Sequence, residues 1–276
     1  MSDPRTILAR ADLAAADLEG RVRAARFSAT TPMTCAAPTA AIRRAPDSAG
    51  EQMDQLLFGE RFEVLEETGG WAWGQARRDG YVGFVERAAL GPAGPAPTHR
   101  VSALRAYAFS EPSIKSRPLG LYSINALVRL GEREGRFAKV SHGGWFVESQ
   151  LAEIGAVETD PAAVAERFLG AAYQWGGRES MGLDCSGLVQ QALFACGRAC
   201  PRDTDQQAQM GAAIEANALT RGDLVFWRGH VGMMLDAERL IHANAHHMAV
   251  ALEPLAEAIA RISAAGSGEP TGYRRV

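Results

Sequence analysis

The sequence predicts an α+β fold, in which two small β-barrels precede a domain that has helices first and a mostly antiparallel sheet after them. Short β-like runs separated by turn residues fill residues 33–155, and a Pro/Gly/Ala segment interrupts them at 91–98. Apolar residues at helical spacing begin after residue 158. The chain has 276 residues, of which 47% are hydrophobic and 22% are charged. This length and composition suit several compact domains and do not suit disorder, collagen-like repeats or a coiled coil.

Charge and hydropathy argue against two classes of partner. Lys and Arg number 29 against 32 Asp and Glu, a net charge of −3, so no basic field would attract a nucleic acid. No run approaches the roughly 18 consecutive apolar residues that cross a bilayer, so we expect no membrane partner. Charged residues interrupt the start of the chain, where a secretory signal would be apolar, and we therefore expect a cytoplasmic protein.

The first third of the chain is expected to hold a helical arm and one barrel. Leu, Ala and charged residues alternate at roughly helical spacing over 6–27, which predicts a helical arm within residues 1–32. The first barrel is placed at 33–92, with turns at Gly59, Gly69-Gly70 and Asp79-Gly80. Its expected strands are Leu56–Phe58, Phe62–Leu65, Trp71–Gln75 and Tyr81–Val85.

A repeated pattern predicts a second barrel of the same kind. The run Phe84-Val85-Glu86 recurs as Phe146-Val147-Glu148, and Gly80-Tyr81 recurs as Gly144-Trp145. Repeated supersecondary units of this length usually fold alike, so the second barrel is placed at 99–157. The segment GPAGPAPT at 91–98 is expected to be an extended linker between the two.

The last domain is placed at 158–276. Asp160-Pro161 is a typical helix start, with Asp as the N-cap and Pro at the first helical position. A second helix is expected to begin near Cys185 and to stop at Gly197, because apolar residues follow Cys185 at helical spacing. Strands are then expected at 224–227, 231–235, 240–243 and 248–252, followed by a helix at 254–262.

Cys185 is the candidate nucleophile. It lies at the first turn of its expected helix, where aligned peptide dipoles and free amide hydrogens favour a thiolate, so we expect a lowered thiol pKa. The other cysteines, Cys35, Cys196 and Cys200, lack this context and are expected to be ordinary thiols. The four do not form the paired CxxC spacings of a zinc ribbon.

His230 and His242 are the candidate partners of this thiol. A nucleophilic thiol needs a base within hydrogen-bond reach, and that base needs a third group to hold its ring. The two histidines are 12 residues apart on consecutive expected strands, so a hairpin could set them side by side. A zinc cluster of His242, His246 and His247 is the alternative, but no acidic fourth ligand stands nearby in the sequence, and we expect no metal and no cofactor.

Four sequence words in the last domain closely resemble NlpC-type cell-wall cysteine peptidases, which have a papain-like fold. They are AAYQWGGRESMGLDCSGLVQQALFACG, PRDTDQQ, RGDLVFWRGHVGMMLD and LIHANA, in the family order. The resemblance implies Cys185 as the nucleophile, His230 as the general base and His242 as the residue that orients it. It also implies that Tyr173 lies over the active site beside the oxyanion position. The two upstream segments resemble bacterial Src-homology-3-like domains.

The resemblance also implies a substrate. The family cleaves peptidoglycan stem peptides, commonly between γ-D-glutamate and the following diamino acid, and members with such upstream domains select a free N-terminal L-alanine. On this basis Asp184 and Ser186 would bind the substrate ammonium, and Tyr81 and Glu51 would reach in from the first barrel. We expect a murein peptide of the L-Ala-γ-D-Glu-diaminopimelate type as the substrate, in cell-wall peptide recycling.

Two other functions fit the same residues. An amidase or acyltransferase could use the same Cys–His core on a different bond. A non-catalytic protein could use the barrels to bind wall peptides, with the last domain as a scaffold. The sequence leaves open which diamino acid is accepted, what the second barrel does and which oligomer forms.

Overall fold

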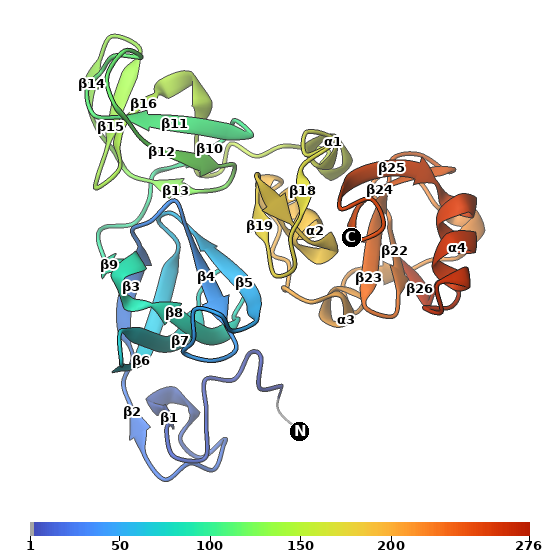
Figure 1. The fold of residues 1–276 in the computed structure, drawn as a ribbon, viewed down its shortest axis with the longest axis horizontal. Helices are drawn as coiled ribbons and strands as arrows, with labels where there is room; N and C mark the ends of the chain where they lie inside the picture. Colours follow the sequence, from blue (N-terminus) through green and yellow to red (C-terminus); the bar gives the residue numbers. More distant parts are fainter. Residues whose placement is uncertain (1–2) are drawn as a thin grey trace. The chain divides into compact units, whose positions relative to one another are not determined.

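The computed structural model describes residues 3–276, which form two compact units (Figure 1). The first unit ends at Ile154 and the second begins at Gly155. Helices are few and most strand pairs are antiparallel, in keeping with the predicted α+β class. No helix within the described residues is long and apolar enough to cross a membrane.

Residues 31–92 of the first unit form the first β module, a seven-stranded sheet with the order β5-β4-β8-β7-β6-β3-β9. Its expected turns are confirmed, since Gly59, Gly69, Gly70 and Gly80 all have positive φ angles, which glycine adopts at little cost. Side chains of β6 alternate between buried and half-buried, so Phe62 and Val64 enter the core. The strands are β3 (Thr31–Cys35), β4 (Thr39–Arg43), β5 (Gln52–Leu57), β6 (Arg61–Thr68), β7 (Trp71–Ala76), β8 (Val82–Glu86) and β9 (Leu90–Pro92).

Residues 99–153 form the second β module, with a five-stranded sheet β12-β11-β16-β15-β14 and a three-stranded sheet β13-β10-β17. The strands are β10 (His99–Val101), β11 (Arg105–Phe109), β12 (Pro118–Ser123), β13 (Leu127–Val128), β14 (Leu130–Glu134), β15 (Phe137–Val140), β16 (Gly144–Val147) and β17 (Leu151–Glu153).

The sequence repeat corresponds to a structural repeat in the two modules. In the first module, β8 leads through a 3₁₀ helix at Arg87–Ala89 into β9. In the second, β16 leads through a 3₁₀ helix at Glu148–Gln150 into β17. The repeated residues therefore mark the same strand, 3₁₀ helix and strand sequence in both modules.

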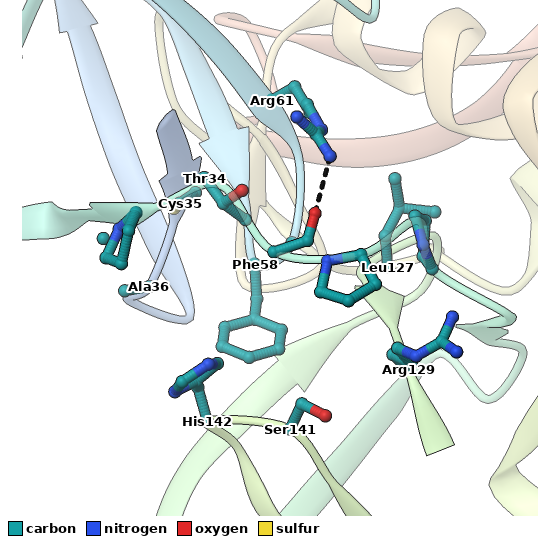
Figure 2. Close-up of a pocket in the computed structure, with 15 residues that line it drawn as sticks. Thr34, Cys35, Ala36, Phe58, Arg61, Leu127, Arg129, Ser141 and His142 are labelled. Carbon is teal, nitrogen blue, oxygen red and sulfur yellow. Dashed lines mark hydrogen bonds between the residues drawn. The ribbon is translucent and has the colours of Figure 1, made fainter. Parts of the chain in front are cut away.

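A cavity of about 210 Å³ lies between the two modules within the first unit (Figure 2). The backbone N–H of Leu127 donates to the carbonyl of Phe58 at 2.8 Å beside it. Three basic side chains line the cavity, namely Arg61, Arg129 and His142, and its lining contains no acidic residue. Arg61 and Arg129 donate to the carbonyls of residues 94 and 96, and so hold the linker against the modules.

The predicted N-terminal helical arm is wrong. Between residues 3 and 30 the structure has two short paired strands, β1 (Ala14–Ala15) and β2 (Phe27–Ser28), and a single 3₁₀ turn at Ala16–Leu18. Leu8, Leu13 and Leu18 are buried together against Trp73 of β7. Their spacing of five residues does not keep them on one face of a helix, and the chain instead bends to bury all three in one core with Trp73. Residues 1–2 of the predicted arm lie outside the described part.

The second unit contains α1 (Pro161–Glu166), α2 (Cys185–Ala195), α3 (Thr204–Gln207) and α4 (Leu255–Ala264), together with a 3₁₀ turn at Ala216–Ala218. Its nine-stranded sheet has the order β19-β20-β18-β25-β24-β23-β22-β26-β21, in which every pair is antiparallel except β18–β20. The strands are β18 (Ala172–Tyr173), β19 (Arg178–Glu179), β20 (Gly182–Leu183), β21 (Ala212–Ala213), β22 (Leu224–Trp227), β23 (His230–Met234), β24 (Arg239–Asn244), β25 (Ala249–Pro254) and β26 (Gly272–Arg275).

Two helices of this unit begin where the sequence predicts them. Asp160 caps α1 by accepting hydrogen bonds from the backbone of residues 162 and 163, with Pro161 at the first position. Helix α2 is buried along its whole length and contacts α1, β23 and β24, so it is the central helix of the unit. Helix α4 packs on the sheet through Ala258 and Ile262, which join the core that contains Trp227.

Candidate active site

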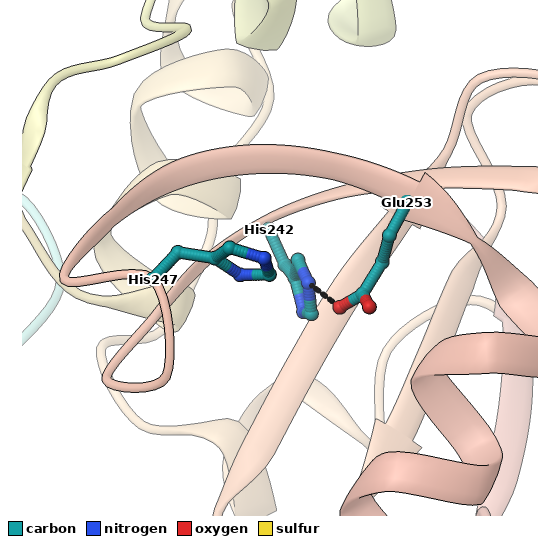
Figure 3. A group of neighbouring side chains, drawn as sticks. All are labelled: His242, His247 and Glu253. Carbon is teal, nitrogen blue, oxygen red and sulfur yellow. Dashed lines mark hydrogen bonds and ion pairs between the residues drawn. The ribbon is translucent and has the colours of Figure 1, made fainter.

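The pairing of β24 and β25 sets a histidine beside a carboxylate. His242 lies opposite Ala251, so Glu253 lies two residues further along β25 on the same face of the sheet. Diagonal neighbours of this kind are within reach of long side chains. His242 Nε2 is 2.6 Å from Glu253 Oε1 (Figure 3).

The pairing of β23 and β24 sets the second histidine on the other side of the first. Met234 pairs with Leu240, and this register places His242 opposite Gly232, with His230 two residues along on the same face. A Cβ atom at Gly232 would lie 2.4 Å from Leu240 Cδ1, so a larger residue here would require the Leu240 side chain to shift. His230 Nε2 is 2.8 Å from His242 Nδ1. The predicted side-by-side placement of the two histidines is therefore confirmed.

These contacts form a continuous relay, which we define as His230, His242, Glu253 and Arg261. Arg261, on α4, donates from Nε to Glu253 Oε2 at 3.4 Å, and its Nη2 donates to Oε1 of the same carboxylate. His242 is completely buried, and the side chain of Glu253 is 11% exposed. The indole of Trp227 packs against the His230 ring, with 5.7 Å between centroids. The relay is thus ordered by packing as well as by hydrogen bonds.

Cys185 begins α2, as the sequence predicts, with Asp184 as the N-cap residue. The backbone N–H groups of Ser186 and Val231 lie close enough to its sulfur to favour the thiolate. Because Val231 follows His230 directly in β23, the second contact places the thiol beside the strand that carries the candidate base. Cys185 is 7% exposed, and all four cysteines of the chain are free thiols.

The protonation of this thiol differs from the prediction. Burial raises the pKa of Cys185 to about 12, and the negative charge of Asp184 acts in the same direction, while the two backbone hydrogen bonds and Arg202 oppose it. Burial also lowers the pKa of His230 to about 3. The expected lowering of the thiol pKa by the helix start is therefore wrong, since burial and the N-cap carboxylate outweigh the helix dipole. Before substrate binds, the proton stays on sulfur and the imidazole is neutral.

Tyr173 lies near the thiol. Burial raises the pKa of its phenol, and the charges of Cys185 and Asp184 raise it further, against the effect of Arg202. These charge effects arise only between close groups, so the phenol shares the surroundings of Cys185 and Asp184. The backbone N–H of Tyr173 donates to the carbonyl of Met248 at 2.9 Å, which ties β18 to the turn that precedes β25.

Comparison with known proteins agrees with this geometry. The model of the NlpC/P60 family matches residues 170–263, the segment that contains Cys185, His230 and His242. The second unit is an NlpC/P60 cysteine peptidase domain. The model of the bacterial dipeptidyl-peptidase Sh3 domain matches residues 42–90, within the first β module, so the peptidase domain follows a bacterial SH3-like domain.

Relatives of the NlpC/P60 domain that extend over most of this chain are also found. A γ-D-glutamyl-L-lysine dipeptidyl-peptidase from Bacillus cereus is 26% identical over 239 residues, which cover 75% of this chain and 72% of the relative. Dipeptidyl-peptidase 6 from Lysinibacillus sphaericus is 23% identical over 224 residues, or 72% of this chain and 82% of the relative. The crystal structure of an NlpC/P60 family protein from Bacillus cereus has a TM-score of 0.76 at 21% identity, covering 89% of this chain and 99% of that one, so the two share a fold.

Asp184 and Ser186, the expected ammonium ligands of the NlpC/P60 domain, both interact with Arg202. Arg202, itself 1% exposed, donates to Asp184 Oδ2 at 2.6 Å, to Asp184 Oδ1 at 3.0 Å and to Ser186 Oγ at 2.7 Å. The carboxylate also accepts from the backbone N–H groups of Gly176 and Gly187. An ammonium would share this carboxylate with the guanidinium of Arg202, and the expected contact of Asp184 and Ser186 with substrate stays a prediction.

Tyr81 and Glu51 belong to the first unit. Tyr81 is 2% exposed and packs among the core residues of the first β module. Glu51 is exposed and pairs with Arg44, with 2.8 Å between Nε and Oε2. Because the thiol of the NlpC/P60 domain belongs to the second unit, the expected contact of these two residues with substrate stays a prediction.

For the alternative of a metal site in the NlpC/P60 domain, the structure offers an acidic ligand, Glu253, that the sequence did not suggest. The donor atoms of His242, His247 and Glu253 lie within 4.8 Å of one another (Figure 3). His246 is not part of this group and packs its ring against His247. Both ring nitrogens of His242 already make hydrogen bonds, and Glu253 pairs with Arg261. These groups serve the relay, and we assign no metal to them.

Three functional residues of the NlpC/P60 domain were missed by sequence reasoning. Glu253 and Arg261 complete the relay, and Arg202 neutralises the N-cap carboxylate. Arg202 lies in the word PRDTDQQ, which the resemblance singled out without assigning it a role. Glu253 carries a weaker signal, namely a lone carboxylate on the strand that pairs with that of His242.

Proposed function

We propose that this protein hydrolyses the bond between γ-D-glutamate and the following diamino acid in peptidoglycan stem peptides with a free N-terminal L-alanine. The observation that carries this proposal is the placement of Cys185 beside the strand that contains His230. The ring of His230 is hydrogen-bonded to His242, and all three residues lie in the segment that matches the NlpC/P60 family. The choice of bond is supported by relatives named for dipeptidyl-peptidase activity, one of them on γ-D-glutamyl-L-lysine, that span both units.

The geometry suits a two-step acyl-enzyme mechanism. His230 Nε2 is engaged by His242, so Nδ1 is the nitrogen available to take the thiol proton as the sulfur attacks the γ-glutamyl carbonyl carbon. The N–H of Cys185 is among the first of α2, which have no intrahelical acceptor, and together with the Tyr173 phenol it would stabilise the oxyanion. His230 then protonates the leaving amine and afterwards takes a proton from the water that releases the γ-glutamyl product.

The burial of the thiol and the imidazole has a consequence for this mechanism. Both groups are neutral at rest, because burial raises the pKa of Cys185 and lowers that of His230. Proton transfer to His230 therefore accompanies attack, so the S–H bond breaks as the S–C bond forms, and the imidazolium appears together with the oxyanion.

The proposal extends to the fold family of the domains and to the cellular compartment. We infer a papain-like arrangement, supported by a nucleophile at the start of the central helix α2 and a base on the adjacent sheet. We also infer that both β modules are SH3-like barrels, the second on the strength of its structural repeat. We propose that the substrate is a soluble murein fragment and that cleavage serves recycling in the cytoplasm, as the sequence predicts.

The test is product analysis on matched peptides. The purified protein is incubated with L-Ala-γ-D-Glu-L-Lys, with the diaminopimelate peptide and with the N-acetylated form of each, and products are identified by mass spectrometry. We expect L-Ala-γ-D-Glu and the free diamino acid from the unblocked peptides alone. Equal cleavage of blocked and free peptides would contradict the requirement for a free amine, and release of products from another bond would favour the amidase alternative.

A further inference from the structure

We propose that Glu253, held by Arg261, is a positioning residue that fixes the tautomers of both relay histidines and keeps His230 Nδ1 unprotonated for Cys185. The inference depends on the Cys185–His230 chemistry and not on the identity of the peptide. It extends the relay beyond the two histidines that the sequence words contain, to a strand and a helix that follow them in the chain.

The position of Glu253 is determined by the sheet. It lies on the same face of β25 as Ala251, which is directly opposite His242, and the contact between His242 Nε2 and Glu253 Oε1 is 2.6 Å. Such a short distance is typical of a hydrogen bond to a charged group. His242 is completely buried, so water cannot replace the carboxylate as its acceptor.

The charge of Glu253 is maintained by two donors. Burial would raise the pKa of its carboxyl, but hydrogen bonds from His242 and Arg261, together with their charges, lower it to about 2. Glu253 is therefore ionised throughout the neutral range and can only accept hydrogen bonds. Arg261 cannot accept a hydrogen bond, so it orients the carboxylate without competing for the proton of His242.

The tautomers follow from this charge. Since Glu253 only accepts, His242 Nε2 must carry a proton and donate it to the carboxylate. In a neutral ring His242 Nδ1 is then an acceptor, so the proton of the 2.8 Å contact lies on His230 Nε2. His230 is neutral because burial lowers its pKa, and its Nδ1 consequently has a free lone pair. This is the form of the base that can take the thiol proton.

The same carboxylate acts on the charge that develops during catalysis. When His230 takes the proton of Cys185 it becomes an imidazolium, and the negative charge of Glu253 favours it through His242. Two further basic side chains act on the relay histidines, namely Arg261 of the relay itself and His247 from the turn between β24 and β25. Arg261 opposes the imidazolium, so the carboxylate is the group that offsets both positive charges.

The test compares Glu253→Gln with Glu257→Gln as a matched control. Glu257 is an exposed carboxylate on α4, one turn before Arg261, and lies outside the relay. A Gln at 253 can donate as well as accept, so both tautomer chains become possible. We expect Glu253→Gln to lower kcat about 10- to 100-fold with KM within about twofold, and Glu257→Gln to leave both unchanged. Glu253→Asp, which keeps the charge, should recover part of the loss.

Two readouts need no peptide and separate this proposal from the proposed substrate. Nitrogen-15 NMR of the wild-type protein should show His230 and His242 both protonated on Nε2, with a mixture of tautomers in Glu253→Gln. Alkylation of Cys185 by iodoacetamide should slow in Glu253→Gln by about the same factor as kcat. If the Gln variant does not fold, the tautomers of the wild-type protein still decide the question.

Three results would overturn the proposal. One is a wild-type His230 protonated on Nδ1. Another is a kcat for Glu253→Gln within about twofold of that for Glu257→Gln. The third is a loss of kcat without any change in tautomer or in alkylation rate, since that would leave Glu253 with a structural role only.

Discussion

His230 Nε2 lies 2.8 Å from His242 Nδ1, and this contact gives the two nitrogens of His230 different tasks. One nitrogen holds the ring to the buried part of the relay. The other, Nδ1, is left for the thiol of Cys185, which contacts the backbone of the neighbouring residue Val231. We therefore expect the proton to move from the sulfur of Cys185 to Nδ1 of His230.

Cys185→Ala should abolish hydrolysis while the protein stays folded. The sulfur is the only nucleophile that the site assigns, so the loss should be at least about 10⁴-fold in kcat. Cys196→Ala is the matched control, because Cys196 lies at the end of the same helix and has a comparable exposure of 9%. Steady-state kinetics and thermal unfolding check both variants. Retained activity in Cys185→Ala would contradict the assignment.

His242→Ala should lower kcat about 10²- to 10⁴-fold with little change in KM, because His230 then loses the acceptor that fixes its tautomer. His242→Asn should retain more activity, since its side-chain carbonyl can still accept from His230 Nε2. The exposed His247 serves as the control, and His247→Ala should be close to wild type. Equal losses in the Ala and Asn variants would argue against an orienting role.

Acidification should destabilise the protein through the buried histidine. Burial lowers the pKa of His230 from its ordinary value of 6.5 to about 3. Between these values the unfolded chain binds a proton at this residue and the folded chain does not, so the free energy of unfolding falls as pH falls, by at most about 1.4 kcal/mol per pH unit. Above 6.5 neither state is protonated there, and the effect vanishes.

Urea unfolding of the wild type and of His230→Gln, from neutral pH down to about 4, measures this dependence. The variant should show a shallower loss of stability on acidification. Glu253 adds a separate dependence at lower pH, because its pKa is lowered from 4.5 to about 2 and its contribution is lost as pH falls through that interval. Identical slopes for the wild type and His230→Gln would contradict the buried neutral imidazole.

Arg202→Met should destabilise the second unit by about 3–5 kcal/mol, because it leaves the carboxylate of Asp184 buried without its cation. Arg198→Met is the control, since Arg198 is exposed and its guanidinium donates to the carbonyl of Val276. Chemical denaturation gives the free energies of unfolding. The double variant Asp184→Asn/Arg202→Met should recover a large part of the loss, and failure to do so would mean that the pair contributes through packing alone.

The sequence predicted those parts of the fold that depend on local chemistry. Glycines with positive φ mark the turns of the first β module, and Asp160-Pro161 and Asp184 mark helix starts. The prediction of a helical N-terminal arm was wrong because its leucines are buried with Trp73, a residue far along the chain. Helical spacing of apolar residues does not reveal packing against so distant a residue.

Local motifs and the spacing of one hairpin predicted part of the candidate site. Cys185, His230 and His242 follow from a helix start and a 12-residue spacing. The role of Glu253 depends on the register of β24 with β25, and that of Arg202 on a contact 18 residues from Asp184. The thiol pKa was missed for the same reason, since burial is a property of the assembled unit.

The most direct measurement is mass spectrometry of the intact protein, quenched during turnover of L-Ala-γ-D-Glu-L-Lys and then digested. We expect a covalent L-Ala-γ-D-glutamyl adduct on the peptide that contains Cys185, absent from Cys185→Ala. Continued turnover with no adduct on any cysteine, or an adduct on Cys196 or Cys200 in its place, would contradict it.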